Sequence, residues 1–223
     1  MVISVRESGW HLMMGGTFDP VHFGHLRTAL EVKEQLSIDC VHLMPCHDPV
    51  HGKVPGATAE QRLKMLKLAL AGQTGLLADG RELDRAGQSY TVDTLIGLRE
   101  ELGATVPVGL LMGADSFLGF DHWKQWQKIL TLSNLVVFHR PGWELDRTSR
   151  VFSKLEKLDI SPVSGLNGAE AGANGSVVFV ETTQMAISSS QIRQAFALGR
   201  SPRYLLPDNV LRFIVDNALY GAV

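Results

Sequence analysis

The sequence predicts an α/β fold in which a doubly wound, mostly parallel sheet carries helices on both of its faces. Short apolar runs alternate along the chain with segments whose apolar residues recur at helical spacing. Glycine, proline or a helix-capping residue separates most of these segments. Such alternation is typical of strand–helix–strand units that build a parallel sheet.

In the first half of the chain, boundary residues define three strands and three helices. We expect strands over residues 11–14, 40–44 and 75–78, and helices over residues 26–35, after Thr58, and over Thr91–Leu102. Gly15 and Gly16 end the first strand, and Pro45 closes the second. Thr58 and Gln61 have the spacing of a capping box, and leucines then follow on one helical face.

In the second half, we expect strands over residues 108–112, 135–138 and 177–180, and helices over residues 121–130, 190–198 and 208–219. Asp121 is the expected N-cap of the first of these helices. Gly199 stops the second helix, and Pro207 with Asp208 opens the third. This order of elements predicts a Rossmann-like fold, which binds ligands at the carboxyl ends of the strands where the winding reverses.

One domain is expected to span residues 1–223. Residues 1–9 are an N-terminal extension that lacks the apolar core and the cleavage site of a signal peptide. Residues 161–175 are rich in Gly, Ala and Ser and predict a flexible surface loop. Residues 187–223 form a C-terminal helical part. No apolar run approaches the about 20 residues that a membrane-spanning helix needs.

Charge and cysteine content argue against several classes of function. The formal net charge of −2 provides no basic field for duplex nucleic acid or an anionic membrane, so neither is an expected partner. Cys40 and Cys46 are the only cysteines, and neither belongs to a CxxC pair or a cluster with ligand spacing. We therefore expect a reducing, cytoplasmic location, no disulfide scaffold and no metal site formed by the protein.

The most informative stretch lies between the first strand and the first helix and reads GGTFDPVHFGH, from Gly15 to His25. Paired glycines after a strand let the backbone approach a phosphate closely, and the next helix N-terminus offers free N–H groups. His22 and His25 are three residues apart, so both imidazoles can address one group. A tight turn would explain the glycines alone, but the whole constellation favours an anion site.

This stretch resembles the adenylyl-binding motif of the nucleotidylyltransferases that carry an (H/T)xGH element, and residues 22–25 match that element. Far downstream, residues 187–193 read ISSSQIR and resemble the ISSTxIR motif of the same family, with Ser190 in place of the commoner Thr. The resemblance implies one nucleotidylyltransferase domain with an ATP site built from both motifs. It assigns catalysis to His22, His25 and Arg193, and ATP binding to Gly15, Gly16, Thr17, Phe18, His22, His25, Gly113, Asp115, Ile187, Ser188, Ser189, Ser190 and Arg193.

The chemistry of such a site follows from the charge on its substrates. A phosphomonoester acceptor is largely dianionic at neutral pH, because its second pKa is about 6. Its attack on the α-phosphorus of ATP therefore needs positioning and charge neutralisation more than a base. His22 and His25 would hold α- and β-phosphate oxygens, and the serine hydroxyls with Arg193 would hold the leaving pyrophosphate. The simpler alternatives are that Ser188 only caps its helix and that Arg193 lies on a solvated face.

Further stretches resemble bacterial nicotinate mononucleotide adenylyltransferases, and the resemblance extends from about residue 11 to residue 220 without the loop of residues 161–175. These stretches are residues 47–51, 81–83, 89–95, 112–116 and 139–142, together with Trp123. The resemblance assigns acceptor binding to Asp19, His51, Tyr90, Thr91, Trp123 and Arg140. Trp123 would stack on the pyridine ring, and helix-start amides beside Tyr90 would bind its carboxylate. Core packing of Trp123 and a stacking role for Trp126 are the alternatives.

One departure from the family concerns the loop after the second strand. Where the family commonly has PPHR, this chain has Pro49, Val50 and His51 followed by Gly52 and Lys53. If the missing Arg normally meets phosphate, Lys53 would substitute as a point charge without the bidentate fork of a guanidinium.

The implied reaction transfers the adenylyl group of ATP to nicotinic acid mononucleotide, giving deamido-NAD and pyrophosphate in NAD biosynthesis. Mg²⁺ is expected to arrive with ATP, because the sequence shows no carboxylate cage for it. Nicotinamide mononucleotide and phosphopantetheine are alternative acceptors, and a non-catalytic nucleotide-binding sensor is an alternative of another class. The oligomeric state is not predicted.

Overall fold

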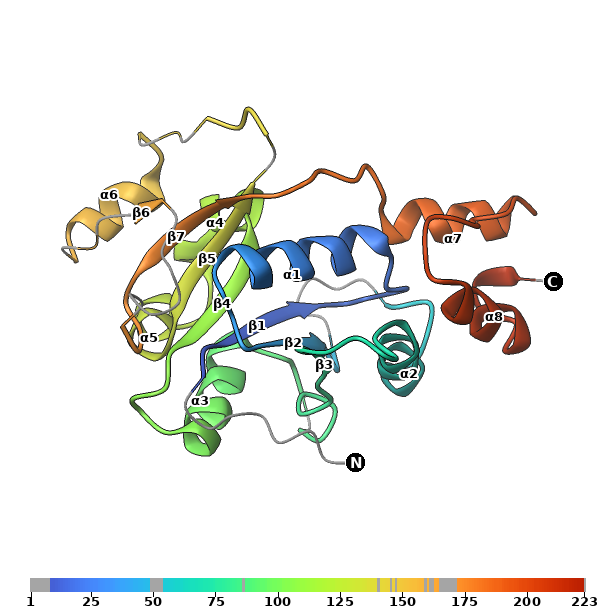
Figure 1. Cartoon of the computed structure of the whole chain (residues 1–223), viewed down its shortest axis with the longest axis horizontal. Helices are drawn as coiled ribbons and strands as arrows, with labels where there is room; N and C mark the ends of the chain where they lie inside the picture. Colours follow the sequence, from blue (N-terminus) through green and yellow to red (C-terminus); the bar gives the residue numbers. More distant parts are fainter. Residues whose placement is uncertain are drawn as a thin grey trace.

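A computed structural model describes residues 9–48, 54–85, 87–139, 141–144, 146, 148–158, 160, 163–164 and 172–222. Within these residues a seven-stranded parallel sheet has the order β3-β2-β1-β4-β5-β7-β6 (Figure 1). The strands are β1 (His11–Gly16), β2 (Cys40–Pro45), β3 (Leu76–Ala78), β4 (Val108–Gly113), β5 (Asn134–His139), β6 (Val163–Ser164) and β7 (Val177–Glu181). The chain winds one way from β1 to β3 and the other way from β4 onward. This confirms the doubly wound, Rossmann-like fold.

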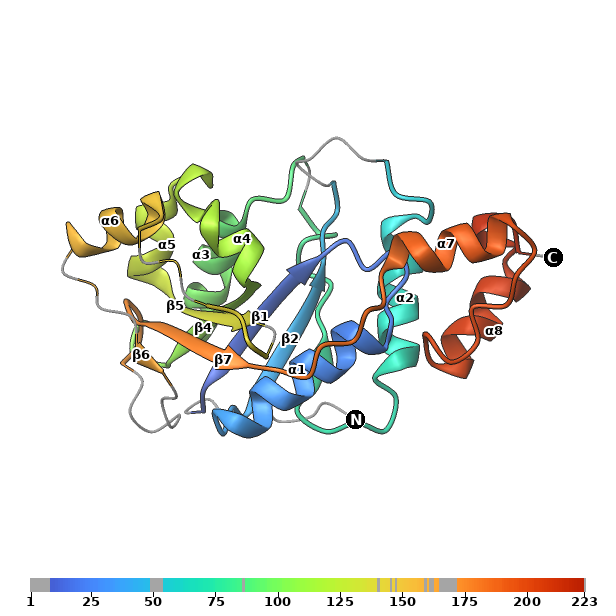
Figure 2. The same ribbon diagram turned by 90° about the horizontal axis from the view of Figure 1, so that it is seen from above.

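Helices cover both faces of this sheet. They are α1 (Phe23–Gln35), α2 (Ala59–Ala69), α3 (Thr91–Leu102), α4 (Ala114–Leu118), α5 (Trp126–Leu132), α6 (Arg150–Glu156), α7 (Ser189–Ala197) and α8 (Asp208–Asp216). The capping box of α2 is present, because the Thr58 side chain and Gln61 cap each other's backbone N–H groups. In two views α7 and α8 lie at the opposite end of the molecule from α5 and α6 (Figure 2). No described helix is long and apolar enough to cross a membrane.

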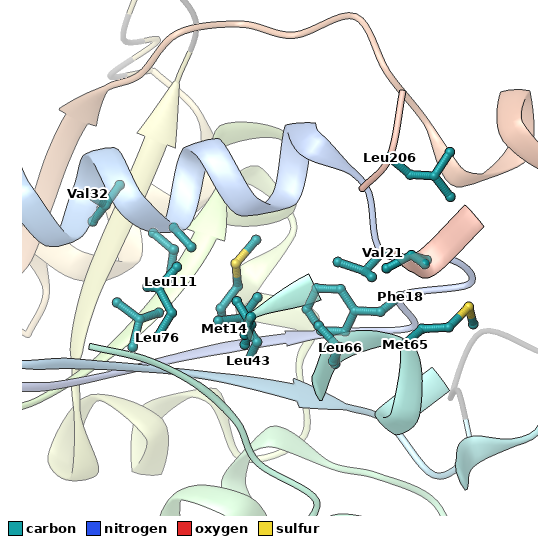
Figure 3. Packing of buried hydrophobic residues seen from close by; sticks show 14 of the residues in the cluster. Met14, Phe18, Val21, Val32, Leu43, Met65, Leu66, Leu76, Leu111 and Leu206 are labelled. Atoms are coloured by element: carbon teal, nitrogen blue, oxygen red, sulfur yellow. The ribbon is translucent and has the colours of Figure 1, made fainter. Parts of the chain in front are cut away.

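Alternation along the strands divides the core into two hydrophobic clusters. Leu12 of β1 belongs to the cluster that includes α1, α2, α7 and α8. Met14 of β1 and Leu43 of β2 pack in the same cluster (Figure 3). Met13 points to the other face, into the cluster that includes α3, α4, α5 and α6. Because successive strand residues point to opposite faces and both faces are covered, the strands read as continuous apolar runs.

The expectation of a single helix over residues 121–130 with Asp121 as its cap is wrong. The chain forms a 3₁₀ turn over Phe120–His122, and Gln125 takes a left-handed conformation with φ of 52° before α5 begins. The Asp121 carboxylate is buried and forms ion pairs with Arg150 (2.7 Å) and Lys154 (2.9 Å) of α6. Two cations on another helix therefore hold this carboxylate in the interior, where a buried charge needs such partners.

Other boundaries differ by a few residues. α1 begins at Phe23 instead of residue 26, because His22 takes the extended N-cap conformation. α8 ends at Asp216, since Ala218 takes a left-handed conformation with φ of 48°, and a 3₁₀ turn over Leu219–Gly221 follows. Neither α4 nor α6 was expected, nor was β6, which lies inside the predicted loop of residues 161–175. Residues 1–8 and most of that loop lie outside the described residues, and a single domain remains a prediction.

Candidate active site

β1 and β4 are neighbours in the sheet, and the loops that follow them leave the same end of it, where the winding reverses. β1 ends at Gly16, and β4 ends at Gly113, which is the N-cap of α4. A Cβ atom on Gly16 would lie 3.2 Å from the ring of Phe18, a buried residue with φ of 49°, so a tight turn requires glycine there. An added Cβ on Gly15 would meet no described heavy atom within 4 Å. Asp115 is exposed in the first turn of α4.

His22 and His25 form a stacked pair at the start of α1. Their ring centroids are 3.7 Å apart and their planes differ by 25°. Burial lowers the pKa of His22 to about 4, and burial together with the charge of His22 lowers the pKa of His25 to about 3. Both rings are therefore neutral near pH 7, and each offers one N–H donor. Among the described residues the buried Nδ1 atoms of both rings have no hydrogen-bond partner.

The serine segment at the start of α7 lies against the loop after β1. Ser189 Oγ donates a hydrogen bond to the carbonyl of Pro20 (2.8 Å). The hydroxyl of Ser188 accepts one from the N–H of Gln191 (3.2 Å), so Ser188 caps α7 as the sequence predicts. Ile187 precedes this cap and packs against the core cluster of α1. The structure therefore brings the two predicted motifs into direct contact.

Arg193 reaches from α7 back to the first motif. Its Nη1 donates a hydrogen bond to the backbone carbonyl of Asp19 (2.6 Å), and its Nη2 donates to Ser190 Oγ (3.4 Å). The side chain is 34% exposed, so it lies at the edge of the site and not on a fully solvated face. These contacts hold the guanidinium in one orientation before any ligand binds.

The carboxylate of Asp19 is the centre of the contacts around this loop. Its oxygens accept hydrogen bonds from the Gly56 amide (2.8 Å), the Ala57 amide (3.2 Å) and the Tyr220 phenol (2.7 Å). Arg193 adds an ion pair at 3.5 Å. Burial, and then the hydrogen bond to Asp19, raises the pKa of Tyr220 well above its usual range, so the phenol remains a donor. Because these partners already occupy the carboxylate, a role for Asp19 in acceptor binding stays a prediction.

Arg62 of α2 is a buried cation behind the same loop, with only 1% of its surface exposed. Its guanidinium donates to the backbone carbonyls of Thr17 (2.8 Å), His47 (3.2 Å) and Ala57 (3.3 Å). It forms no ion pair within the described part of the chain. Arg62 therefore ties three loops together and places a positive charge behind the first motif. The sequence does not indicate this role, because a charged residue in an amphipathic helix normally lies on the exposed face.

The start of α3, with Tyr90 and Thr91, lies near the segment that contains Trp123. Tyr90 is the N-cap of α3, and its side chain makes no capping hydrogen bond to the helix. Ser89 Oγ accepts a hydrogen bond from the His47 amide (3.0 Å), so this helix start meets the loop after β2. Lys124 Nζ lies 3.9 Å from the centre of the Tyr90 ring, which brings the segment that contains Trp123 beside α3.

Two indoles flank this point. Trp123 and Trp126 both pack edge-on against Phe120, with ring centroids 5.7 Å and 6.0 Å from it. Lys154 Nζ lies 5.5 Å from the centre of the Trp126 ring. Trp123 is the residue before Lys124, whose amino group lies over the Tyr90 ring. Both indoles are half-buried, so each combines core packing with an accessible edge. His51, Gly52, Lys53 and Arg140 lie outside the described residues.

Replacing Tyr220 by Phe removes one hydrogen bond from a buried carboxylate and leaves the ring in place. Because hydrogen bonds to charged groups contribute about 1.5–3 kcal/mol, we expect the free energy of unfolding in urea to fall by that amount. Tyr204→Phe is the matched control and should leave stability unchanged, because Tyr204 is 81% exposed. A Tyr220→Phe protein as stable as the control would contradict the importance of this contact.

The lowered pKa values of His22 and His25 should make the folded protein sensitive to mild acid. These histidines stay neutral in the fold until about pH 4 and about pH 3, whereas a histidine in the unfolded chain has its ordinary pKa of 6.5. The unfolded state therefore binds more protons, and the free energy of unfolding should fall as the pH drops below 6.5. Urea unfolding at about pH 7 and about pH 5 measures this fall.

The double variant His22→Asn, His25→Asn should show a smaller fall than the wild type. His122→Asn changes an exposed histidine and should retain the full fall. If the double variant proves as acid-sensitive as the wild type, the acid sensitivity has another source.

Comparison with known proteins supplies the family. The profile of the cytidylyltransferase-like family matches residues 13–195. A probable nicotinate-nucleotide adenylyltransferase of Cellvibrio japonicus is 46% identical over 208 residues, which are 93% of this chain and 97% of the relative. The protein of the same name from Hahella chejuensis is 44% identical over 220 residues, 98% of this chain and 99% of the relative.

Solved structures agree on the fold. Nicotinic acid mononucleotide adenylyltransferase of Plasmodium falciparum, complexed with NaAD, matches with a TM-score of 0.73 over 96% of this chain and 98% of that chain. At 14% sequence identity, this likeness supports the fold alone. The family profile and the relatives above 40% identity lead to one conclusion. The chain belongs to the cytidylyltransferase-like family, and within it to the nicotinate-nucleotide adenylyltransferases.

Proposed function

We propose that the protein transfers the adenylyl group of ATP to nicotinic acid mononucleotide, forming nicotinic acid adenine dinucleotide and releasing pyrophosphate. The observation that carries this proposal is the contact of Ser189 and Arg193 with the loop that ends in the stacked histidines. The relatives at 46% and 44% identity bear the name of this activity. We place the reaction in the cytoplasm, in keeping with the free thiols of Cys40 and Cys46.

The proposed reaction is an in-line displacement at the α-phosphorus. A phosphate oxygen of the acceptor forms the new bond, and the bond from the α-phosphorus to the bridging oxygen of pyrophosphate breaks. The acceptor needs little base catalysis, because its second pKa of about 6 leaves it dianionic. His22 and His25 act in this proposal as neutral N–H donors to the α- and β-phosphate oxygens, where negative charge develops. Their burial strengthens such hydrogen bonds.

The start of α7 is proposed to hold the leaving pyrophosphate. A helix N-terminus presents unpaired N–H groups and the positive end of the helix dipole. Arg193 adds a permanent cation whose planar fork is already oriented by the Asp19 carbonyl. The open space beside Gly15 lets the triphosphate approach the backbone after β1, and Gly113 with Asp115 is proposed to contact ATP from the start of α4.

Nucleotidyltransferases generally use a divalent metal ion with ATP, and we propose Mg²⁺ in this role. Asp19 is the acidic residue of the first motif, but its carboxylate already has two amides, a phenol and a guanidinium as partners. It therefore does not fit a magnesium ligand in this arrangement. We propose that the ion arrives bound to the phosphates of ATP, and we assign it no protein ligand.

The acceptor is proposed to bind between the start of α3 and Trp123. Trp123 would stack on the pyridine ring, and the helix-start amides at Tyr90 and Thr91 would bind the carboxylate. A site that hydrogen-bonds a carboxylate leaves its donors unpaired when an amide takes that place, so the acid should be preferred. His51 and Arg140 are proposed as further acceptor contacts, with Lys53 in place of the family's arginine.

Turnover with three acceptors tests the proposal. The protein is incubated with ATP, Mg²⁺ and either nicotinic acid mononucleotide, nicotinamide mononucleotide or phosphopantetheine, and pyrophosphate and product mass are measured. We expect the acid dinucleotide, with a kcat/KM higher than that for the amide by orders of magnitude. Equal efficiency with the amide would refute carboxylate recognition. Absence of pyrophosphate with all three acceptors would favour a non-catalytic sensor.

Replacing His25 by Ala should lower kcat by about 10²–10³-fold, which is the effect of losing one donor to the transition-state charge. Steady-state assays measure kcat, and urea unfolding checks that the fold survives. His122→Ala is the matched control at an exposed histidine and should retain wild-type turnover. Near-normal turnover of the His25→Ala protein would remove His25 from the catalytic site.

Replacing Trp123 by Ala should weaken binding of nicotinic acid mononucleotide by about 1 kcal/mol, roughly 5-fold, because an aromatic partner of the ring is lost. ATP affinity should stay near its wild-type value in calorimetric titrations. Trp126→Ala is the matched control, since Trp126 packs on the same Phe120. If Trp126→Ala weakens acceptor binding and Trp123→Ala does not, the stacking assignment is wrong.

A further inference from the structure

A cluster of three possible metal ligands lies away from the active site. His11 is the first residue of β1, Cys40 is the first residue of β2 and pairs with it in register, and His42 follows two residues later on the same face. One nitrogen of each histidine and the Cys40 sulfur all lie within 4.8 Å of one another. The exposed fractions are 0%, 5% and 4%, so the cluster is fully enclosed. At about 3.3 Å per strand residue, the five steps from His11 to Gly16 put it about 16 Å from the nucleotide edge.

A carboxylate orients the central histidine of this cluster. His42 Nδ1 lies 3.0 Å from Asp79 Oδ2, so Nδ1 carries the proton and donates it. The other ring nitrogen, Nε2, is directed at His11 Nδ1, 2.9 Å away. Asp79 is in turn held by Arg81 at 2.8 Å, and Arg81 reaches Glu101 at 3.0 Å. Metal-binding histidines characteristically donate their second N–H to a carboxylate in this way.

We propose that His11, Cys40 and His42 form a zinc site, with His11 Nδ1, His42 Nε2 and the Cys40 thiolate as ligands. Two imidazoles and one thiolate are a donor set that suits Zn²⁺. Zn–N bonds of about 2.0–2.1 Å in a tetrahedron place two nitrogens about 3.3 Å apart. The two histidine nitrogens, now 2.9 Å apart, need to separate by only a few tenths of an ångström.

The ion takes the place of the proton that the two imidazoles share, and its binding releases the proton of the Cys40 thiol. Among the described residues the group has three members, so a water molecule would complete the tetrahedron. An enclosed site at the start of two neighbouring strands has no route for a substrate. The proposed ion is therefore structural, and it links β1 to β2 at the edge of the sheet opposite the nucleotide site. This differs from the sequence-based expectation that the protein itself forms no metal site.

Zinc binding by the purified full-length protein tests the proposal. Competition with a chromophoric chelator should show one tight zinc site per chain, and the unfolding midpoint should rise when Zn²⁺ is added. Co²⁺ in the same site should give a thiolate charge-transfer band. A wild-type protein that binds no zinc, or whose cobalt spectrum lacks this band, overturns the proposal, so the test does not depend on any variant folding.

Variants then assign the ligands. Cys40→Ser should lose the cobalt charge-transfer band, whereas Cys46→Ser, the matched control at the other cysteine, should keep it. Asp79→Asn should keep the band but weaken zinc affinity by about 10–100-fold, the usual effect of removing a carboxylate behind a ligand. If Cys40→Ser does not fold, His11→Gln supplies the same comparison through its loss of zinc affinity. Retention of full zinc affinity in His11→Gln, or loss of the band in Cys46→Ser, overturns the assignment.

Discussion

Pairing the buried charge of Asp19 is the constraint on which the rest of the active site depends. A carboxylate in the interior needs hydrogen bonds and a cation, because burying it unpaired costs several kcal/mol. Its partners come from three other segments: the turn before α2, the helix α7, and the last residues of the chain. Satisfying one side chain therefore brings these segments together. The serine segment meets the loop after β1 as a result of that assembly.

The proposed nucleotide site contains few permanent positive charges. Arg62 lies behind the first motif and Arg193 at its open side, and both are held by backbone carbonyls. The two histidines between them are neutral near pH 7, because burial lowers the pKa of both. In the proposed site the guanidinium groups would therefore supply long-range attraction for ATP, and the imidazoles would supply directed hydrogen bonds. Because neither imidazole is charged near pH 7, the two rings do not repel each other, and packing can fix the positions of their N–H donors.

Features determined by neighbouring residues were predicted well from the sequence. The capping box at Thr58 and the helix over Thr91–Leu102 belong to this class. Features that join distant segments were not predictable in the same way. Tyr220 donates a hydrogen bond to Asp19, 201 residues earlier in the chain, and Arg62 donates one to the carbonyl of Thr17, 45 residues earlier. Aspartate is a common helix cap, so the local sequence favours that role for Asp121. Only the packing of α6 shows that its partners are Arg150 and Lys154.

The hydrogen bond from Tyr220 to Asp19 bears on the order in which parts of the protein can fold during synthesis. The chain is synthesised from its N-terminus, so Asp19 leaves the ribosome 201 residues before the phenol that satisfies it. Strands β1 and β2 can pair early, because their sequence separation is short, but the loop between β1 and α1 must stay hydrated meanwhile. The first motif in the sequence is thus among the last parts of the molecule to reach its final geometry. We therefore expect the proposed nucleotide site to reach its final geometry only after Tyr220 has left the ribosome.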